Sequence, residues 1–107
     1  MSFNCNDTER SDKVAEALKQ VIDPEIGLNV IDLGLIYNVD FIEKEQKIIC
    51  TMTLTTQFCP MGESITDGVK FALQEAFEGY EADVELTFEP PWNYDMISDE
   101  GRLFLRM

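Results

Sequence analysis

Apolar residues recur along this chain at two spacings, and each spacing predicts a different kind of element. Positions 14–22 carry apolar residues at the three-to-four-residue interval of an amphipathic helix. Asp7, Thr8 and Ser11 are candidate N-caps for this helix, since short oxygen-bearing side chains accept the free N–H groups of a first turn. Pro24 is expected to end the helix, because the residue before a proline avoids the helical conformation.

The next part of the chain alternates between apolar and polar positions and then returns to helical spacing. Residues 35–42 and 47–55 alternate, which predicts two strands, and the short charged segment 43–46 between them predicts an antiparallel hairpin. A second helical pattern runs from about 60 to 78. Residues 84–88 alternate again, and the helix before them allows this third strand to run parallel to the second through a right-handed crossover.

These elements predict one small α+β domain of 107 residues, with the order α-β-β-α-β. We expect a three-stranded mixed sheet with helices packed on one face, followed by a short C-terminal helix over about 98–105. Residues 1–10 are polar and are expected to form a flexible N-terminal segment. The loop 23–34 carries five aliphatic residues, so it is expected to pack on the core in one fixed shape.

The composition narrows the classes of function. The net charge of −13, from 21 acidic and 8 basic residues, repels phosphate backbones and argues against nucleic-acid binding. The same charge attracts metal cations and basic partner surfaces, and it also keeps a small protein soluble. No run reaches the roughly 18 apolar residues of a membrane span, and no export signal opens the chain. We therefore expect a cytoplasmic protein without a membrane segment.

The chain has three cysteines, no CxxC pair and no histidine, which excludes the common structural zinc patterns and histidine-based catalysis. Cys59 precedes Pro60 at the start of the second predicted helix, where free N–H groups and the macrodipole favour a thiolate. Nearby acids oppose that ionisation, and a bound soft cation such as iron or zinc would reverse the penalty. Alternatively, Cys59 is a small buried hydrophobe. Cys50 shares the core-facing side of its strand, and Cys5 lies in the polar N-terminal segment.

Two further groups of residues have both a structural and a functional interpretation. Asp23 and Glu25 either end a helix and form an exposed turn, or provide rigid oxygen ligands or a proton acceptor. Thr55 and Thr56 either satisfy backbone groups at the strand end or hydrogen-bond a ligand beside Cys59. We expect these four residues to converge with Cys59 in one pocket at the edge of the sheet.

Trp92 follows two consecutive prolines, and it too has two interpretations. It is either an anchor of the core or an exposed aromatic contact for a partner protein. Both interpretations are kept.

Four stretches of the chain, 21–27, 30–37, 52–61 and 90–98, together resemble the SufT/PaaD-like metal–sulfur cluster biosynthesis family. The resemblance covers about residues 12–105. It implies a small α+β fold and an accessory or carrier role in maturing iron–sulfur proteins, with no established catalytic activity.

The signature positions of the family fall on Asp23, Glu25, Thr55, Thr56 and Cys59. The chain departs from the family pattern in two places. Phe58 stands where the family commonly has a small residue, which narrows access to the thiol, and the ending 102–107 differs from the usual leucine-glycine.

The resemblance implies an iron–sulfur cluster or iron that is bound transiently and not firmly, with the assembly machinery and apo-protein clients as partners. A single thiolate cannot hold a four-iron cluster, which takes four ligands. A cluster would therefore be shared between chains, as in a homodimer, or with a client, or be held only briefly. Two other functions stay open: a thiol redox protein that uses Cys59, and a non-catalytic interaction subunit of a multicomponent enzyme that uses Trp92 and the tail.

Overall fold

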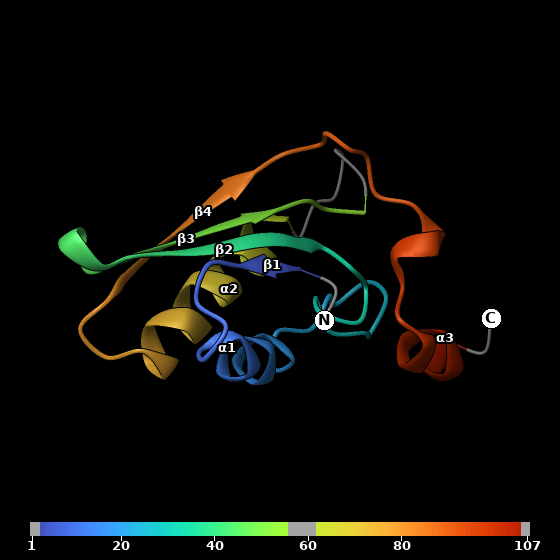
Figure 1. Ribbon diagram of the computed structural model, residues 1–107. Helices are drawn as coiled ribbons and strands as arrows, with labels where there is room; N and C mark the ends of the chain where they lie inside the picture. Colours follow the sequence, from blue (N-terminus) through green and yellow to red (C-terminus); the bar gives the residue numbers. More distant parts are fainter. Residues whose placement is uncertain (1–2, 56–61, 106–107) are drawn as a thin grey trace.

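The computed structural model describes residues 3–55 and 62–105 (Figure 1). Four strands form one sheet, and two of the helices lie along the same face of it. The elements in chain order are β1 (Asn4–Cys5), α1 (Ser11–Leu18), β2 (Ile36–Ile42), η1 (Glu43–Glu45), β3 (Lys47–Met52), α2 (Gly62–Ala76), β4 (Glu81–Leu86), η2 (Tyr94–Met96) and α3 (Asp99–Leu105).

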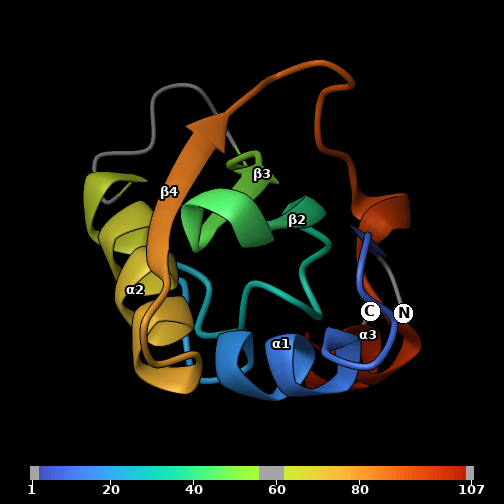
Figure 2. The same ribbon diagram turned by 60° about the vertical axis from the view of Figure 1, so that its left-hand side comes forward.

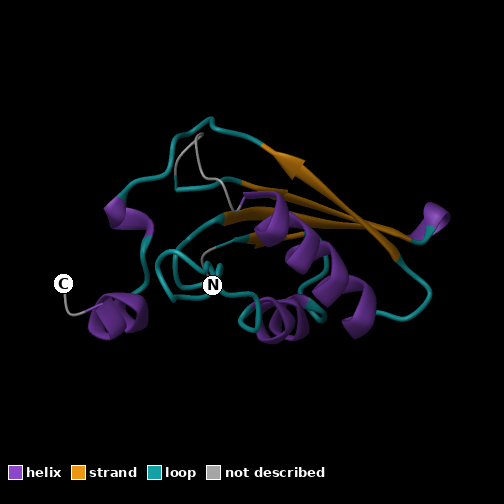
Figure 3. Cartoon of the chain, turned by 180° about the vertical axis from the view of Figure 1, so that it is seen from behind, coloured by secondary structure: helices purple, strands orange, loops and turns teal. Residues whose placement is uncertain are grey.

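The sheet has the order β1-β2-β3-β4 and mixes parallel with antiparallel pairs. The predicted hairpin is confirmed, because β2 and β3 are antiparallel, and β4 lies parallel to β3 after the α2 crossover as predicted. Helices α1 and α2 both lie beneath the sheet in Figures 1 and 3, so its opposite face is not covered by either helix. Within the part of the chain that the structure describes, no helix is long and apolar enough to cross a membrane.

The prediction of three strands is wrong, because the N-terminal segment contributes a fourth strand. β1 pairs with β2 in parallel. The Asn6 side chain then extends this pairing: its amide donates to Phe41 O at 3.0 Å, and its oxygen accepts from Phe41 N at 2.8 Å. Phe3 is buried in the core. The segment before α1 therefore pairs with β2 through two backbone positions and then through an amide side chain that substitutes for backbone pairing.

Helix α1 begins at Ser11 and ends at Leu18, short of the stop predicted at Pro24. The backbone after it turns to pair with the following loop, since Val30 N donates to Val21 O and Asp23 N donates to Leu28 O, both at 3.0 Å. Of the predicted caps, Asp7 accepts the backbone N–H groups of Glu9 and Arg10 at 3.1 and 3.2 Å, in the turn just before α1. Arg10 occupies the N-cap position without a side-chain cap bond.

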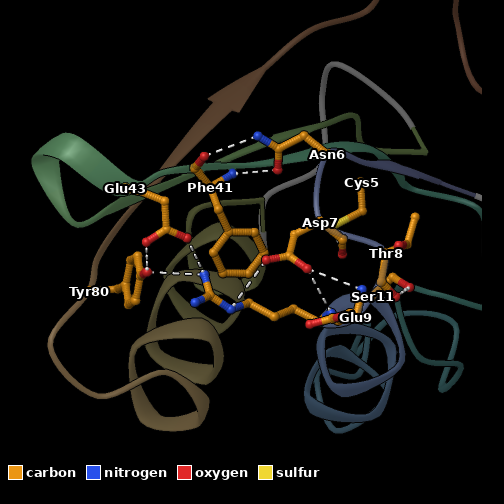
Figure 4. A network of polar contacts seen from close by, with 10 residues as sticks. Cys5, Asn6, Asp7, Thr8, Glu9, Ser11, Phe41, Glu43 and Tyr80 are labelled. Atoms are coloured by element: carbon orange, nitrogen blue, oxygen red, sulfur yellow. Dashed lines mark hydrogen bonds and ion pairs between the residues drawn. The ribbon is translucent and has the colours of Figure 1, made fainter.

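Arg10, which directly precedes α1, contacts Glu43 after β2 and Tyr80 before β4, both of which Figure 4 labels. Its guanidinium donates to Glu43 Oε1 at 2.7 Å and lies 4.9 Å from the centre of the Phe41 ring. The Tyr80 hydroxyl donates to the second Glu43 oxygen at 2.6 Å. The Tyr80 and Arg10 hydrogen bonds hold the pKa of Glu43 below its usual value, because both stabilise the carboxylate.

The core lies between the sheet and the two helices. β3 alternates as predicted, with Ile48, Cys50 and Met52 fully buried against the helices. Helix α2 buries Ile65, Val69 and Leu73, the apolar stripe that its spacing predicts. The loop between α1 and β2 also packs on the core, which confirms the prediction for 23–34; its buried aliphatic residues are Leu28, Val30, Ile31 and Leu33.

Candidate functional site

The candidate site starts at Asp23, whose side chain is almost fully buried. Its Oδ1 accepts the backbone N–H of Glu25 at 2.9 Å, and its backbone oxygen accepts the N–H of Gly27 at 2.7 Å. These bonds form a tight turn around Pro24 that fixes the Asp23 carboxylate. Glu25 is exposed at the outer side of this turn. Of the predicted pair, only Asp23 is enclosed by the fold.

The end of β3 lies against the end of the same loop. Thr53 N donates to Leu35 O at 2.8 Å, and Thr53 is fully buried. Thr55 is half-buried two residues later. At the start of α2, a Cβ on Gly62 would come within 2.7 Å of Leu54 Cδ1, so the helix start packs directly on the strand end.

Thr56, Phe58 and Cys59 lie outside the described residues. The predicted convergence of Cys59 with Asp23, Glu25, Thr55 and Thr56 therefore stays a prediction.

The segment just before this loop lies against α2. A Cβ on Gly68 would lie 3.2 Å from Val21 Cγ1, and Ile22 and Ser64 line one hollow between α1 and α2. Asp23 therefore follows directly on residues that touch the first turns of α2. Cys59 precedes that helix by three positions in the sequence.

The C-terminal segment holds this loop from outside. The indole N–H of Trp92 donates to Leu33 O at 2.6 Å. Ser98 N donates to Asp32 O and Ser98 Oγ donates to Asp32 Oδ1, both at 2.8 Å. Sequence reasoning did not single out Asp32 or Ser98, although both lie within the stretches 30–37 and 90–98 that carry the family resemblance.

Trp92 is half-buried, and its ring makes an edge contact with Tyr94, their centres 5.3 Å apart. Tyr94 itself is exposed. Through its bond to Leu33, the Trp92 indole helps to hold the loop 23–34 in place. Its use as a partner contact stays a prediction.

The two described cysteines are poor candidates for a reactive thiolate. Burial raises the pKa of Cys50 to about 12, so it is a neutral thiol at physiological pH. Burial likewise raises the pKa of Cys5, whose thiol donates to Asp7 O at 3.2 Å. Within residues 3–55 and 62–105, no group of three or more cysteine, aspartate or glutamate side chains is placed to hold a metal ion.

Comparison with known proteins identifies the family. The sequence model of the iron–sulfur cluster assembly proteins matches residues 11–87. The chain is 40% identical over 97 residues to an Fe–S protein maturation auxiliary factor of Porphyromonas gingivalis, with 91% of each protein covered. It is 41% identical over 85 residues to the Fe–S protein maturation auxiliary factor SufT of Staphylococcus aureus, covering 79% of this chain and 96% of that protein.

A solved structure shares the fold. The crystal structure of a domain of unknown function, DUF59, from Bacillus anthracis superposes with a TM-score of 0.83 at 31% identity and covers 94% of both chains. The sequence match, the relatives and this shared α+β architecture agree with the resemblance carried by the four stretches. The chain therefore belongs to the family of iron–sulfur cluster assembly proteins.

Proposed function

We propose that this protein is an accessory factor that supports the assembly of iron–sulfur clusters or their transfer to apo-proteins, and that it acts through Cys59. The family match over residues 11–87 carries the functional part, because the relatives at about 40% identity are named as maturation auxiliary factors of Fe–S proteins. The role is that of a carrier or helper and not of an enzyme. It takes place in the cytoplasm, with the assembly machinery and apo-protein clients as partners.

The assignment to Cys59 rests on the state of the other thiols. A thiolate is the form that binds iron, and the raised pKa values of Cys50 and Cys5 keep both protonated. In the sequence, Cys59 precedes Gly62, the first described residue of α2, by three positions, and the free N–H groups at a helix start favour a thiolate. The raised pKa of Cys50 also argues against a thiol redox pair, since Cys50 would be a poor resolving thiol.

In this proposal the iron–sulfur cluster is cargo and not a resident cofactor. One thiolate supplies one of the four ligands that a four-iron cluster takes, so the others come from a client, a second copy in a homodimer, or a donor protein. Asp23 is held rigidly by its turn, and we propose that Asp23, Glu25, Thr55 and Thr56 form the polar wall of the pocket around Cys59.

Complementation of a strain that lacks this protein tests the proposal. The readout is the activity of a cluster-dependent client enzyme, with the amount of client polypeptide measured in parallel. Wild type is expected to restore client activity and Cys59→Ser is not, because exchanging sulfur for oxygen keeps the volume but removes the soft ligand. Cys5→Ser makes the same atomic change elsewhere and is expected to rescue fully.

Two results would contradict this proposal in different ways. Full rescue by Cys59→Ser would remove the cysteine from the mechanism and favour an interaction subunit. Failure of wild type to restore the client, with the protein folded and expressed, would remove the maturation role itself.

A further inference from the structure

An apolar groove lies between α1 and α2, lined by residues of both helices. Figures 2 and 3 show how these two helices lie relative to the sheet. Its volume is about 660 Å³. Small residues form much of its lining, among them Ala17 of α1 and Gly68, Ala72 and Ala76 of α2. Because these side chains are short, a partner can approach the helix backbones closely.

Two large apolar side chains line the same groove and remain open to water. Phe71 is 64% exposed and Ile22 is 48% exposed. Exposed aromatic residues beside an apolar hollow are typical of the centres of protein interfaces. Helix α2 spans 15 residues, about four turns, which is enough to align a partner helix along the groove.

The rim of the groove is acidic. Two smaller hollows adjoin it, one through the shared residues Phe71 and Glu75 and the other through Ala17 and Ala76. Together they bring three carboxylates to the rim, those of Glu16, Glu75 and Glu78. The lysine beside them, Lys13, lies with its ammonium 5.0 Å from the centre of the Phe77 ring. Apolar lining with an acidic rim complements an amphipathic helix that carries lysine or arginine.

We propose that the groove between α1 and α2 binds a basic amphipathic helix of a partner protein. The inference rests on the proposed function for the identity of that partner, a component of the assembly machinery or an apo-protein client. Ile22, which precedes Asp23, and Ser64, in the first turn of α2, both line the groove. A helix seated there is held beside the start of α2, which follows Cys59 in the sequence.

A second copy of this chain fits the groove less well. Each copy carries a net charge of −13, so two copies repel each other. An acidic occupant would also form no favourable charge contacts with the acidic rim. The C-terminal helix α3 exposes Leu103 and Phe104 but begins with Asp99 and Glu100. A basic amphipathic helix complements both the apolar lining and the acidic rim of the groove.

A binding experiment with a synthetic probe tests the groove directly. The probe is a fluorescent amphipathic peptide of about 16 residues, roughly 24 Å when helical, with leucine on one face and lysine on the other. A second peptide replaces every lysine by glutamate. The protein variants are Phe71→Ser and, as a matched control, Phe104→Ser on α3, where the phenylalanine is 62% exposed.

The lysine peptide is expected to bind wild type and Phe104→Ser equally, and Phe71→Ser about tenfold more weakly, the effect of losing one aromatic hot spot. The glutamate peptide is expected not to bind. Equal binding of the lysine peptide by both serine variants would overturn the proposal, since the attraction would then come from diffuse charge. A wild-type dimer that Phe71→Ser dissociates would also overturn it, because a second copy would then be the occupant.

The complementation assay separates this inference from the proposed function. Phe71→Ser is expected to reduce rescue severalfold, while Phe104→Ser rescues like wild type. Full rescue by Phe71→Ser together with loss in Cys59→Ser would overturn the groove and leave the cysteine mechanism standing. If wild type itself fails to rescue, the maturation role falls, and the peptide experiment still decides whether the groove binds a basic helix.

Discussion

Replacing Gly34 by alanine tests whether contacts with the C-terminal segment stabilise the loop 23–34. Gly34 has a φ of +78°, a region that costs a non-glycine residue about 1–2 kcal/mol. A Cβ at this position would overlap the Met96 backbone oxygen and lie 2.9 Å from the Met96 carbonyl carbon. The obstacle is backbone, so it cannot rotate away as a side chain could.

The expected loss in free energy of unfolding follows from the displacement of the segment around Met96. Relieving the overlap displaces the segment that carries Trp92 and Ser98, so their bonds to Leu33 O and Asp32 O, at 2.6 and 2.8 Å, are stretched or broken. Each bond contributes about 1 kcal/mol, and overpacking adds about 1–3 kcal/mol. The steric part of the Gly34→Ala change therefore costs about 3 kcal/mol or more, a large fraction of the 5–15 kcal/mol that typically stabilises a domain.

Gly79→Ala is the matched control. Its φ of +86° imposes the same backbone penalty, but nothing lies within 4 Å of the Cβ position. Urea unfolding is followed by circular dichroism and by the fluorescence of Trp92, the only tryptophan of the chain. Gly34→Ala is expected to lose about 3 kcal/mol more than Gly79→Ala and to shift the native emission to the red. Variants that agree within about 1 kcal/mol, with unchanged emission, would refute the reasoning.

Three further outcomes follow from the same structure. Iodoacetamide at neutral pH is expected to label Cys59 faster than Cys50, whose thiol is buried with a pKa of about 12; equal rates by mass spectrometry would count against an accessible thiolate. Asn6→Ala is expected to lower the free energy of unfolding by about 2 kcal/mol, because it removes two side-chain bonds to β2 of about 1 kcal/mol each. Asn6→Asp keeps the acceptor for Phe41 N but sets a carboxylate oxygen against Phe41 O, so it is expected to lose at least as much in the same urea unfolding experiment. The depressed pKa of Glu43 stabilises the fold above the unfolded-state value of about 4.3, and this contribution is lost as the pH falls through the folded-state pKa. Tyr80→Phe, which removes the leading cause of that shift, should therefore flatten the acid limb of the stability–pH curve, and an unchanged limb would show that the hydroxyl has no such effect.

Two of the elements that sequence reasoning predicted correctly, β3 and α2, have one face buried along most of their length. β3 buries every second residue and α2 buries one stripe. Because side chains on one face of a strand recur every 2 residues and those on one face of a helix every 3.6, such contact with the core produces a visible apolar pattern in the sequence. β1 was missed because it is only 2 residues long and its partners on β2, Asn38 and Val39, lie far along the chain and leave no local pattern. The early end of α1 was missed for the same reason, since the backbone of Val21 pairs with Val30 and not within the helix.

For the candidate site, too, some features could be predicted from the sequence and others could not. The residue types could be picked out from the sequence, because an aspartate before proline and a cysteine before a helix are unusual local combinations. The burial of Asp23, and the exposure of Glu25 two residues later, depend on the turn that Asp23 itself caps. The bonds that Ser98 donates to Asp32 and Trp92 donates to Leu33 depend on the path of the C-terminal segment. No periodicity predicts such a path.

Described residues from all four stretches that carry the family resemblance lie in the loop 23–34 or contact residues in it or directly after it. The loop contains most of the stretches 21–27 and 30–37. The stretch 52–61 contributes Thr53, whose backbone N–H donates to Leu35 O directly after the loop. The stretch 90–98 contributes Trp92 and Ser98. A site that receives a labile cluster benefits from ligands held in place before the cargo arrives, since ordering them afterwards weakens binding. Bracing one short loop by a strand end, a helix and the C-terminal segment provides that rigidity. In the proposed function, residues far from Cys59 in the sequence, Ser98 among them, would act on cluster transfer only by holding this loop in place.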